Sequence, residues 1–167
     1  MTTMTREIRL FLMILLLCAF ALTMKAQQPA PADTVIADGY IARQQIESYS
    51  WFLKNYNAYK PAKTIIKKLR KHQDVSVLVI LGTWCSDSKE HVPALLKICD
   101  ESGLKELKFI GVNKKKVSST VNIEPYKVTF VPLIILYRNG IEIERIIESP
   151  AKTIEKDLLK ILRQQHK

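Results

Sequence analysis

Apolar residues along the chain form short runs that predict a set of buried strands. Val75 to Leu81 is a β-branched run with little alternation, which is typical of a strand buried on both faces. Leu107 to Val112 and Leu133 to Tyr137 are two further runs of this kind, and Ile141 to Ile147 predicts a fourth strand. Asn139-Gly140 between the last two is a strong hairpin signal, so we expect those two strands to be antiparallel.

Helical periods separate and flank these strands. Aromatic residues recur at helical spacing and predict an amphipathic helix over residues 36–57, which covers one side of the fold. Pro61 suits the first turn of a helix over residues 61–72. Another helical pattern follows Cys85, residues 114–126 are mostly loop or a short helix, and Ser149-Pro150 has the residues of a helix start.

This order of elements predicts an α/β fold built on a mixed, four-stranded sheet. Strands that alternate with helices give a parallel pair, and the hairpin gives an antiparallel pair. We expect helices on both faces of the sheet. The helix over residues 36–57 makes an N-terminal extension to this fold, and its aromatic stripe is expected to belong to the core.

The first 26 residues have the pattern of a secretory signal peptide. Arg6 and Arg9 precede an unbroken apolar run of 13 residues, Leu10 to Leu22. A membrane span takes about 18 residues or more, so this run matches the core of a signal better than an uncleaved anchor. Cleavage after Ala21 and after Ala26 both fit, and we favour Ala26. The mature protein is then expected to be exported to a periplasmic or extracellular compartment, touching the membrane only transiently.

The remaining chain divides into two parts. Residues 27–60 hold a Pro/Ala linker followed by the helical extension, and residues 61–167 form the main domain. A length of 167 residues, with 47% hydrophobic and 25% charged residues, fits one domain and an extension. Removing residues 1–26 takes away three basic residues and one acidic residue, so the net charge falls from +10 to +8. No nucleic-acid motif accompanies the lysines, so we expect a solvated basic face and no nucleic-acid partner.

Cys85 is the strongest candidate for chemistry. It lies between a buried strand and a helix, where unpaired N–H groups and the helix dipole stabilise a thiolate. Ser88, three residues later, is within reach to donate a hydrogen bond to that thiolate, whereas the charge of Asp87 opposes it. Trp84 beside the sulfur is expected to shield it or to receive a side chain of a partner.

At this point the sequence resembles the thioredoxin-like family. The resemblance runs from Val75 to the last helix and depends on Trp84-Cys85-Ser86-Asp87-Ser88 between strand and helix, on Pro93 in that helix, and on Val131-Pro132 before a strand and its hairpin. It implies a thioredoxin-like three-layer fold in which Pro132 is cis and the Val131 backbone faces Cys85. It also implies that this backbone pairs with a bound peptide as an added strand.

The sequence departs from the family pattern at two positions. Ser88 stands where the family's second cysteine belongs, and Val79 stands where thioredoxins carry a buried acid. Cys85 can therefore form a mixed disulfide with a partner but no internal disulfide with residue 88. Cys99 lies 14 residues further along the same predicted helix, about 21 Å away. That distance excludes an internal bond, and we expect Cys99 to be a buried, inert thiol.

Two functions fit these residues. The first is thiol–disulfide exchange through the single nucleophile Cys85, supported by Ser88, with Trp84, Val131 and Pro132 contacting the substrate. Its partners are protein or peptide thiols and disulfides, with a small thiol or a protein as electron donor. The alternative is a redox-inactive module that binds peptides or partner proteins in the groove beside Pro132.

We expect neither a cofactor nor a metal. The chain contains no Gly-rich phosphate loop and no serine nucleophile motif. The histidines His72, His91 and His166 and the two remaining cysteines do not converge into a ligand set. His91 comes six residues after Cys85 and falls on another face of the helix, so it is not expected to act as its base.

Overall fold

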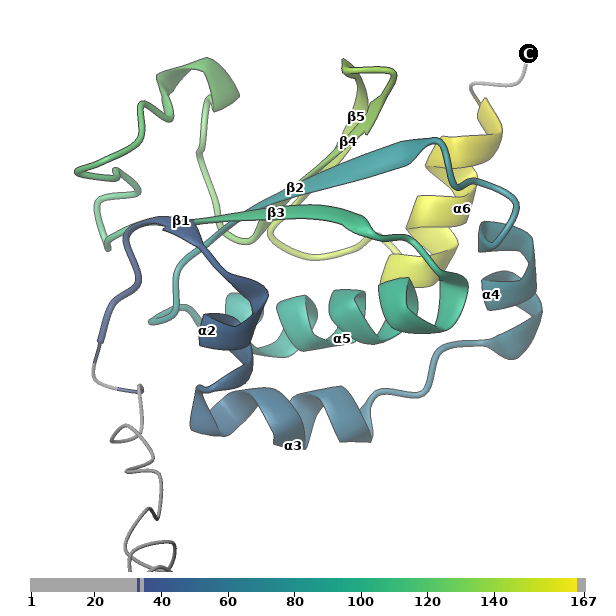
Figure 1. Cartoon of the computed structure of the whole chain (residues 1–167), viewed down its shortest axis with the longest axis horizontal. Coiled ribbons are helices and arrows are strands. Elements are labelled where there is room, and N and C mark those ends of the chain that lie inside the picture. Colours follow the sequence, from purple (N-terminus) through teal and green to yellow (C-terminus); the bar gives the residue numbers. More distant parts are fainter. Residues whose placement is uncertain (1–32, 34, 165–167) are drawn as a thin grey trace, which may run out of the picture. The chain divides into compact units, whose positions relative to one another are not determined.

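The computed structural model describes residue 33 and residues 35–164, which belong to one structural unit (Figure 1). The predicted signal peptide and most of the predicted linker lie outside these residues. Within them no helix has both the length and the apolar character to cross a membrane.

The described chain is an α/β fold around a five-stranded mixed sheet, so the predicted fold class is confirmed. The order of the strands in the sheet is β1-β3-β2-β4-β5. β2 pairs with β3 in parallel and with β4 antiparallel, and the β4–β5 hairpin is antiparallel, as expected. The elements in chain order are β1 Gly39–Ile41, α2 Arg43–Glu47, α3 Ser50–Ala58, α4 Lys63–Leu69, β2 Val75–Leu81, α5 Ser86–Ser102, β3 Glu106–Gly111, the 3₁₀ helix η2 Glu124–Tyr126, β4 Leu133–Arg138, β5 Ile141–Ile147 and α6 Ile154–Gln164.

The fifth strand comes from the segment in which we predicted one helix over residues 36–57, and that prediction was wrong. Ala42 and Tyr49 both adopt extended backbone angles, with ψ of 147° and 137°, and they divide the segment into β1, α2 and α3. β1 pairs antiparallel with β3 at the edge of the sheet. Gly111 permits this pairing, because a Cβ atom there would lie 2.4 Å from the carbonyl oxygen of Ala37. The aromatic stripe does contribute to the core, since Tyr49 and Phe52 are buried.

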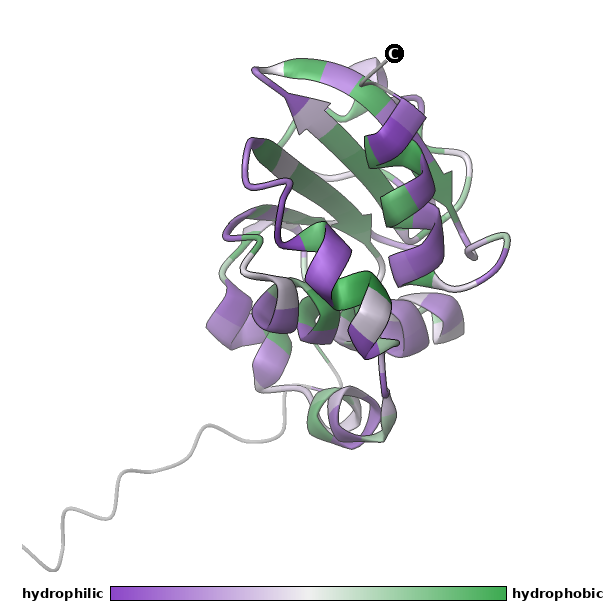
Figure 2. Ribbon diagram, turned by 90° about the vertical axis from the view of Figure 1, so that its right-hand side faces the viewer, coloured by the Kyte–Doolittle hydropathy of each residue, from purple (hydrophilic) through white to green (hydrophobic). Residues whose placement is uncertain are grey.

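The two faces of the sheet are covered differently. Alternate residues of β2 point to opposite faces, as the pleat of a strand requires. Buried residues of all five described α-helices pack with one face, whose cluster includes Val77, Val79 and Leu95. On the other face, Leu78 and Ile80 pack with the connection between β3 and β4, whose helical element is η2. Figures 1 and 2 show the α-helices gathered on one side of the strands, so the expected α-helices on both faces are not found in the described residues.

The last helix begins later than the sequence pattern indicated. Ser149-Pro150 has the residues of a helix start, but α6 begins at Ile154. The carboxylate of Asp157 accepts hydrogen bonds from the backbone N–H groups of Ala151 at 2.6 Å and Lys152 at 3.3 Å. These bonds hold the residues between Pro150 and Ile154 in a non-helical turn. The preference of serine and proline for helix starts does not anticipate this turn.

A buried carboxylate joins α6 to the connection between α3 and α4. Glu155 is 4% exposed and accepts hydrogen bonds from the hydroxyl of Tyr59 at 2.6 Å and the backbone N–H of Ala62 at 3.4 Å. Burial opposes the ionised form, but the bond from Tyr59, with others from backbone N–H groups and Thr153, leaves the pKa of Glu155 below its ordinary value. Burial and the bond to Glu155 raise the pKa of Tyr59. The contact therefore holds α6 against the chain between α3 and α4. Buried residues of these three helices pack with those of α5 in one core cluster.

Candidate functional site

Cys85 lies at the junction of β2 and α5, where the sequence placed it. β2 ends at Leu81, and the backbone N–H of Cys85 donates to the carbonyl oxygen of Gly82 at 2.9 Å, which closes a tight turn. Cys85 is the N-cap of α5, with extended angles of φ −83° and ψ 132°. Its side chain is half-buried and makes no capping hydrogen bond, so the sulfur stands at the N-terminal end of the helix and remains within reach of a reagent.

The sulfur faces the segment that precedes β4. The thiol of Cys85 donates to the carbonyl oxygen of Val131, with a distance of 3.2 Å between Sγ and the oxygen. The peptide bond between Val131 and Pro132 is cis. Two residues that lie 46 positions apart in the sequence thus meet at one end of the sheet, in the arrangement that the resemblance implied.

Ser88 and Asp87 lie in the first turn of α5. The hydroxyl oxygen of Ser88 is completely buried and accepts a hydrogen bond from the backbone N–H of Gly82 at 3.3 Å. Ser88 therefore braces the turn that leads to Cys85, and its support of the thiolate stays a prediction. One carboxylate oxygen of Asp87 lies 4.0 Å from the Cys85 sulfur. A carboxylate at this distance disfavours a second negative charge on the sulfur.

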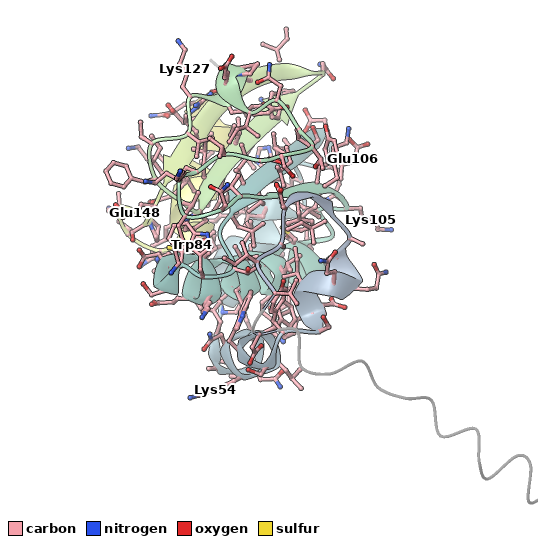
Figure 3. All side chains as sticks on the ribbon, turned by 90° about the vertical axis from the view of Figure 1, so that its left-hand side faces the viewer. Lys54, Trp84, Lys105, Glu106, Lys127 and Glu148 are labelled. Atoms are coloured by element: carbon pink, nitrogen blue, oxygen red, sulfur yellow. The ribbon has the colours of Figure 1, made fainter. Side chains whose placement is uncertain are left out.

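Trp84 is fixed against two backbone segments, the residue after β3 and the turn after β2. Its indole Nε1 donates to the carbonyl oxygen of Val112 at 2.9 Å, just beyond the end of β3. A Cβ atom on Gly82 would lie 2.6 Å from the indole ring, so the absence of a side chain there lets the ring lie on the turn. Trp84 and Cys85 both pack at the margin of the same apolar cluster. Figure 3 shows Trp84 and Glu148 on the same side of the unit.

Phe130 is a site residue that sequence reasoning missed. It directly precedes Val131, and its side chain is 50% exposed. The ammonium group of Lys116 lies 6.0 Å from the centre of its ring. An aromatic side chain left half in solvent, next in sequence to the residue whose carbonyl oxygen faces Cys85, offers apolar contact area. The signal available in the sequence was its place before the Val131-Pro132 pair.

The second cysteine of the described chain lies away from the site. Cys99 is fully buried in the α-helical core cluster, as predicted, and both cysteines are free. Burial, with a smaller effect of Asp100, raises the pKa of Cys99 to about 12, against a lowering effect of Arg43. Cys99 therefore stays a thiol at neutral pH and is shielded from reagents.

The other positions considered from the sequence do not bring a further side chain to the sulfur. Nε2 of His91 lies 3.3 Å from the hydroxyl of Ser149. Val79 is fully buried in the apolar core. Among the described residues, no group of three or more histidines, cysteines or carboxylates has the arrangement of a metal site. In the part of the chain that the structure describes, the polar groups that contact the sulfur are the Val131 carbonyl oxygen and the Asp87 carboxylate.

Comparison with known proteins shows that the fold of this chain is similar to solved structures. No family model and no curated protein matches the sequence. A protein of unknown function from Pseudomonas aeruginosa is 15% identical over 69% of this chain and 81% of its own, with a TM-score of 0.52. An HIV epitope scaffold is 15% identical over 79% of this chain and 95% of its own, with a TM-score of 0.51. Mitochondrial thioredoxin 3 from Saccharomyces cerevisiae is 22% identical over 66% of this chain and 98% of its own, with a TM-score of 0.40. At such identities these likenesses do not carry an activity to this chain.

Proposed function

We propose that this protein carries out thiol–disulfide exchange with Cys85 as its single nucleophile. The observation that carries the proposal is the position of the sulfur. Cys85 is the N-cap residue of α5 and is half-buried, and its sulfur lies 3.2 Å from the Val131 carbonyl oxygen beside the cis peptide bond to Pro132. A helix N-terminus favours the thiolate, and the thiolate is the form that attacks a disulfide.

The exchange consists of two steps, the formation of a mixed disulfide and its resolution. The Cys85 thiolate attacks one sulfur of a substrate disulfide, a new bond joins Cys85 to that sulfur, and the other substrate sulfur leaves as a thiolate that takes up a proton. A second thiolate, from a small thiol or from the substrate's other cysteine, then attacks the mixed disulfide and releases Cys85. With the substrate's own cysteine the result is isomerisation without net oxidation or reduction. Net reduction requires an external thiol, because Ser88 cannot close an internal disulfide.

The substrate is proposed to approach over Trp84 and Phe130. Trp84 precedes Cys85 and packs with it at the margin of one apolar cluster, and Phe130 precedes Val131 and leaves half of its side chain exposed, so both offer aromatic surface. The backbone of Val131 next to Pro132 would pair with an extended segment of the substrate. Partners of this chemistry are proteins or peptides that carry thiols or disulfides.

Reaction with a simple disulfide tests the proposal. The reduced protein is mixed with glutathione disulfide at neutral pH, and the adducts are followed by mass spectrometry. We expect one glutathione on Cys85, formed at least about ten-fold faster than on a peptide of residues 82–90, because the peptide lacks the folded helix terminus. Cys99→Ser should react like the parent protein, and Cys85→Ser should give no adduct.

Reaction of Cys85 no faster than the peptide would contradict the exchange proposal and favour the alternative, a module that binds peptides without redox chemistry. The Asp87 carboxylate, 4.0 Å from the sulfur, and the serine at position 88 are the observations that favour this alternative. In that case a captured partner would remain bound to the Cys85→Ser variant.

Export is the second part of the proposal. The charged start and the run from Leu10 to Leu22 support a cleaved signal peptide, which would deliver Cys85 to an oxidising compartment. Protein recovered from outside the cytoplasm of the producing cell is expected to begin at Gln27. Mass determination of the mature chain measures this directly, and recovery of the full chain from the membrane fraction would instead indicate an uncleaved anchor.

A further inference from the structure

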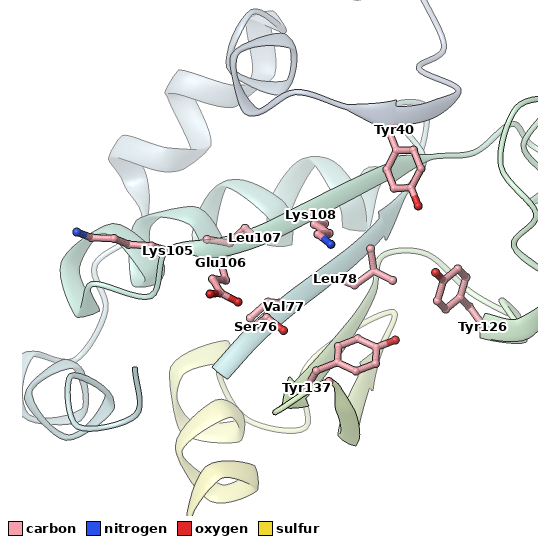
Figure 4. A pocket seen from close by; sticks show the side chains of 11 residues that line it. Tyr40, Ser76, Val77, Leu78, Lys105, Glu106, Leu107, Lys108, Tyr126 and Tyr137 are labelled. Carbon is pink, nitrogen blue, oxygen red and sulfur yellow. The ribbon is translucent and has the colours of Figure 1, made fainter. Parts of the chain in front are cut away.

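A groove lies on the face of the sheet that the α-helices leave uncovered. It encloses about 490 Å³ and runs over the beginning of β2 and β3, away from the end at which β2 leads to Cys85. Its walls come from four strands, the hairpin tip and η2 (Figure 4). The residues that line it are Tyr40, Ser76, Val77, Leu78, Lys105, Glu106, Leu107, Lys108, Tyr126, Tyr137 and Gly140.

The groove exists because the β3–β4 connection covers only part of this face. Ile123 and Val131 from the connection pack with the Ile80 end of the face. Nearer the start of β2, the register places Leu78 between Lys108 on β3 and Ile135 on β4. Leu78 therefore forms an apolar floor with polar and aromatic residues around it.

Three tyrosines stand around this floor although they lie far apart in the sequence. Tyr40 comes from β1, Tyr126 from η2 and Tyr137 from β4, and Figure 4 shows their rings arranged around Leu78. The side chain of Tyr40 is 68% exposed. A tyrosine ring has an apolar face for stacking and a hydroxyl for hydrogen bonding, so it suits a ligand that has both kinds of surface.

The hydroxyl of Tyr137 is available as a donor at neutral pH. Burial raises the pKa of Tyr137, and the neighbouring Glu142 and Tyr126 raise it further, against a lowering effect of Arg145. Arg145 does not add a free positive charge to the groove, because its guanidinium forms an ion pair with Glu142 at 2.6 Å. It also donates to the carbonyl oxygen of Tyr126 at 2.7 Å, which ties η2 to β5.

The charges in the groove argue against a charged ligand. Glu106 pairs across the strands with Ser76, and Lys108 pairs in the same way with Leu78, so an acceptor and a donor of opposite charge lie two positions apart on β3. An anion would meet Glu106 and a cation would meet Lys105 and Lys108. A neutral molecule with several hydroxyl groups can instead accept from the ammonium groups and donate to the carboxylate.

We propose that this groove binds a neutral saccharide through Tyr40, Tyr126 and Tyr137. The C–H face of a sugar ring stacks on an aromatic ring, and its hydroxyls satisfy Ser76, Glu106 and Lys108. A volume of about 490 Å³ lies in the range of small-molecule sites. The site shares no lining residue with the Cys85 site, so it does not depend on the proposed exchange activity.

Titration with neutral oligosaccharides tests the proposal. Cellotetraose, maltotetraose and chitotetraose are added separately to the ¹⁵N-labelled protein, and affinities are taken from the shifts of amide signals. We expect saturable binding of at least one of them, with shifts at β2, β3 and Tyr137. Tyr40→Ala and Tyr137→Ala should each weaken it about ten-fold, as expected for loss of one stacking ring and its buried area. Tyr40→Phe should retain most of the affinity.

Matched controls separate this site from a general effect on the fold. Leu53→Ala removes an exposed apolar side chain on α3 and should leave binding unchanged, as should Cys85→Ser. Thermal unfolding of each variant shows whether it is folded. Failure of all three saccharides to bind at millimolar concentration would overturn the proposal. So would tighter binding of an oligouronide or a single-stranded oligonucleotide, or an unchanged affinity in folded Tyr40→Ala.

Discussion

Replacing Ser88 by cysteine is expected to convert the single-thiol site into a dithiol site. Position 88 is three residues after the N-cap Cys85, in the first turn of α5. The Cα atoms of residues so spaced in a helix lie about 5–6 Å apart, inside the limit for a disulfide. Ser88 is fully buried and accepts from Gly82 in the turn that leads to Cys85, so a sulfur at this position would be shielded from solvent next to that turn. Under mild oxidation of Ser88→Cys the thiols at positions 85 and 88 should both be lost, while the buried Cys99 stays a free thiol.

The gain in activity is expected to be large. With dithiothreitol as donor, Ser88→Cys should reduce insulin roughly ten-fold or more faster than the parent protein, because an internal thiol releases the mixed disulfide without waiting for an external one. Ser88→Ala removes the hydroxyl without adding a thiol and should show no gain. If the thiols at positions 85 and 88 both persist after oxidation of Ser88→Cys, the first turn of α5 does not bring these two positions together.

Replacing Glu155 by glutamine is expected to lower the free energy of unfolding by about 2 kcal/mol at neutral pH. The glutamine can still accept from Tyr59, but its NH₂ group would face the N–H of Ala62, so a buried donor loses its acceptor. Glu142→Gln, at an exposed ion pair with Arg145, is the matched control. It should cost less than about 1 kcal/mol. Urea unfolding of the three proteins measures these differences.

The effect of Glu155→Gln should shrink in acid. The pKa of Glu155 in the folded protein lies below its ordinary value of 4.5, so its ionised form stabilises the fold at every pH above that value. As the pH falls through the lowered pKa, folded and unfolded states both carry a protonated carboxyl, and this contribution is lost. Unfolding free energies of parent and variant should therefore converge as the pH falls below the ordinary value of 4.5 and through the lowered pKa of the folded protein. A difference that is constant over this range would show that the ionised carboxylate is not what stabilises the α3–α6 contact.

Sequence reasoning predicted the centre of the sheet well and its margin poorly. β2 was recovered at Val75–Leu81, because a strand buried on both faces needs apolar side chains on both faces and its pattern is local. The hairpin followed from Asn139-Gly140, where both residues have positive φ. β1 could not be predicted in this way. It is three residues long, and it pairs with β3, where Tyr40 lies opposite Ile110, 70 positions later. The pairing also requires that Gly111 of β3 has no side chain.

The two candidate sites differ in how far the sequence shows them. Cys85 and the Val131-Pro132 pair each belong to a local sequence motif. The resemblance based on these motifs anticipated that they meet at one end of the sheet. The exposure of Phe130 was not, because it depends on how the β3–β4 connection packs. The tyrosine groove had no sequence signal, since Tyr40, Tyr126 and Tyr137 become neighbours only when three separate elements are assembled.

The brevity of β1 has a consequence for self-association. A long, flat strand at the rim of a sheet invites other chains to add to it, and such addition leads to aggregates. β1 occupies the flank of β3 with only three residues, from Gly39 to Ile41. The opposite rim is β5, where Glu142, Glu144 and Arg145 place charges that would have to lose water against an incoming strand. The short strand at one rim and the charged side chains at the other thus both disfavour the addition of a further strand to the described sheet.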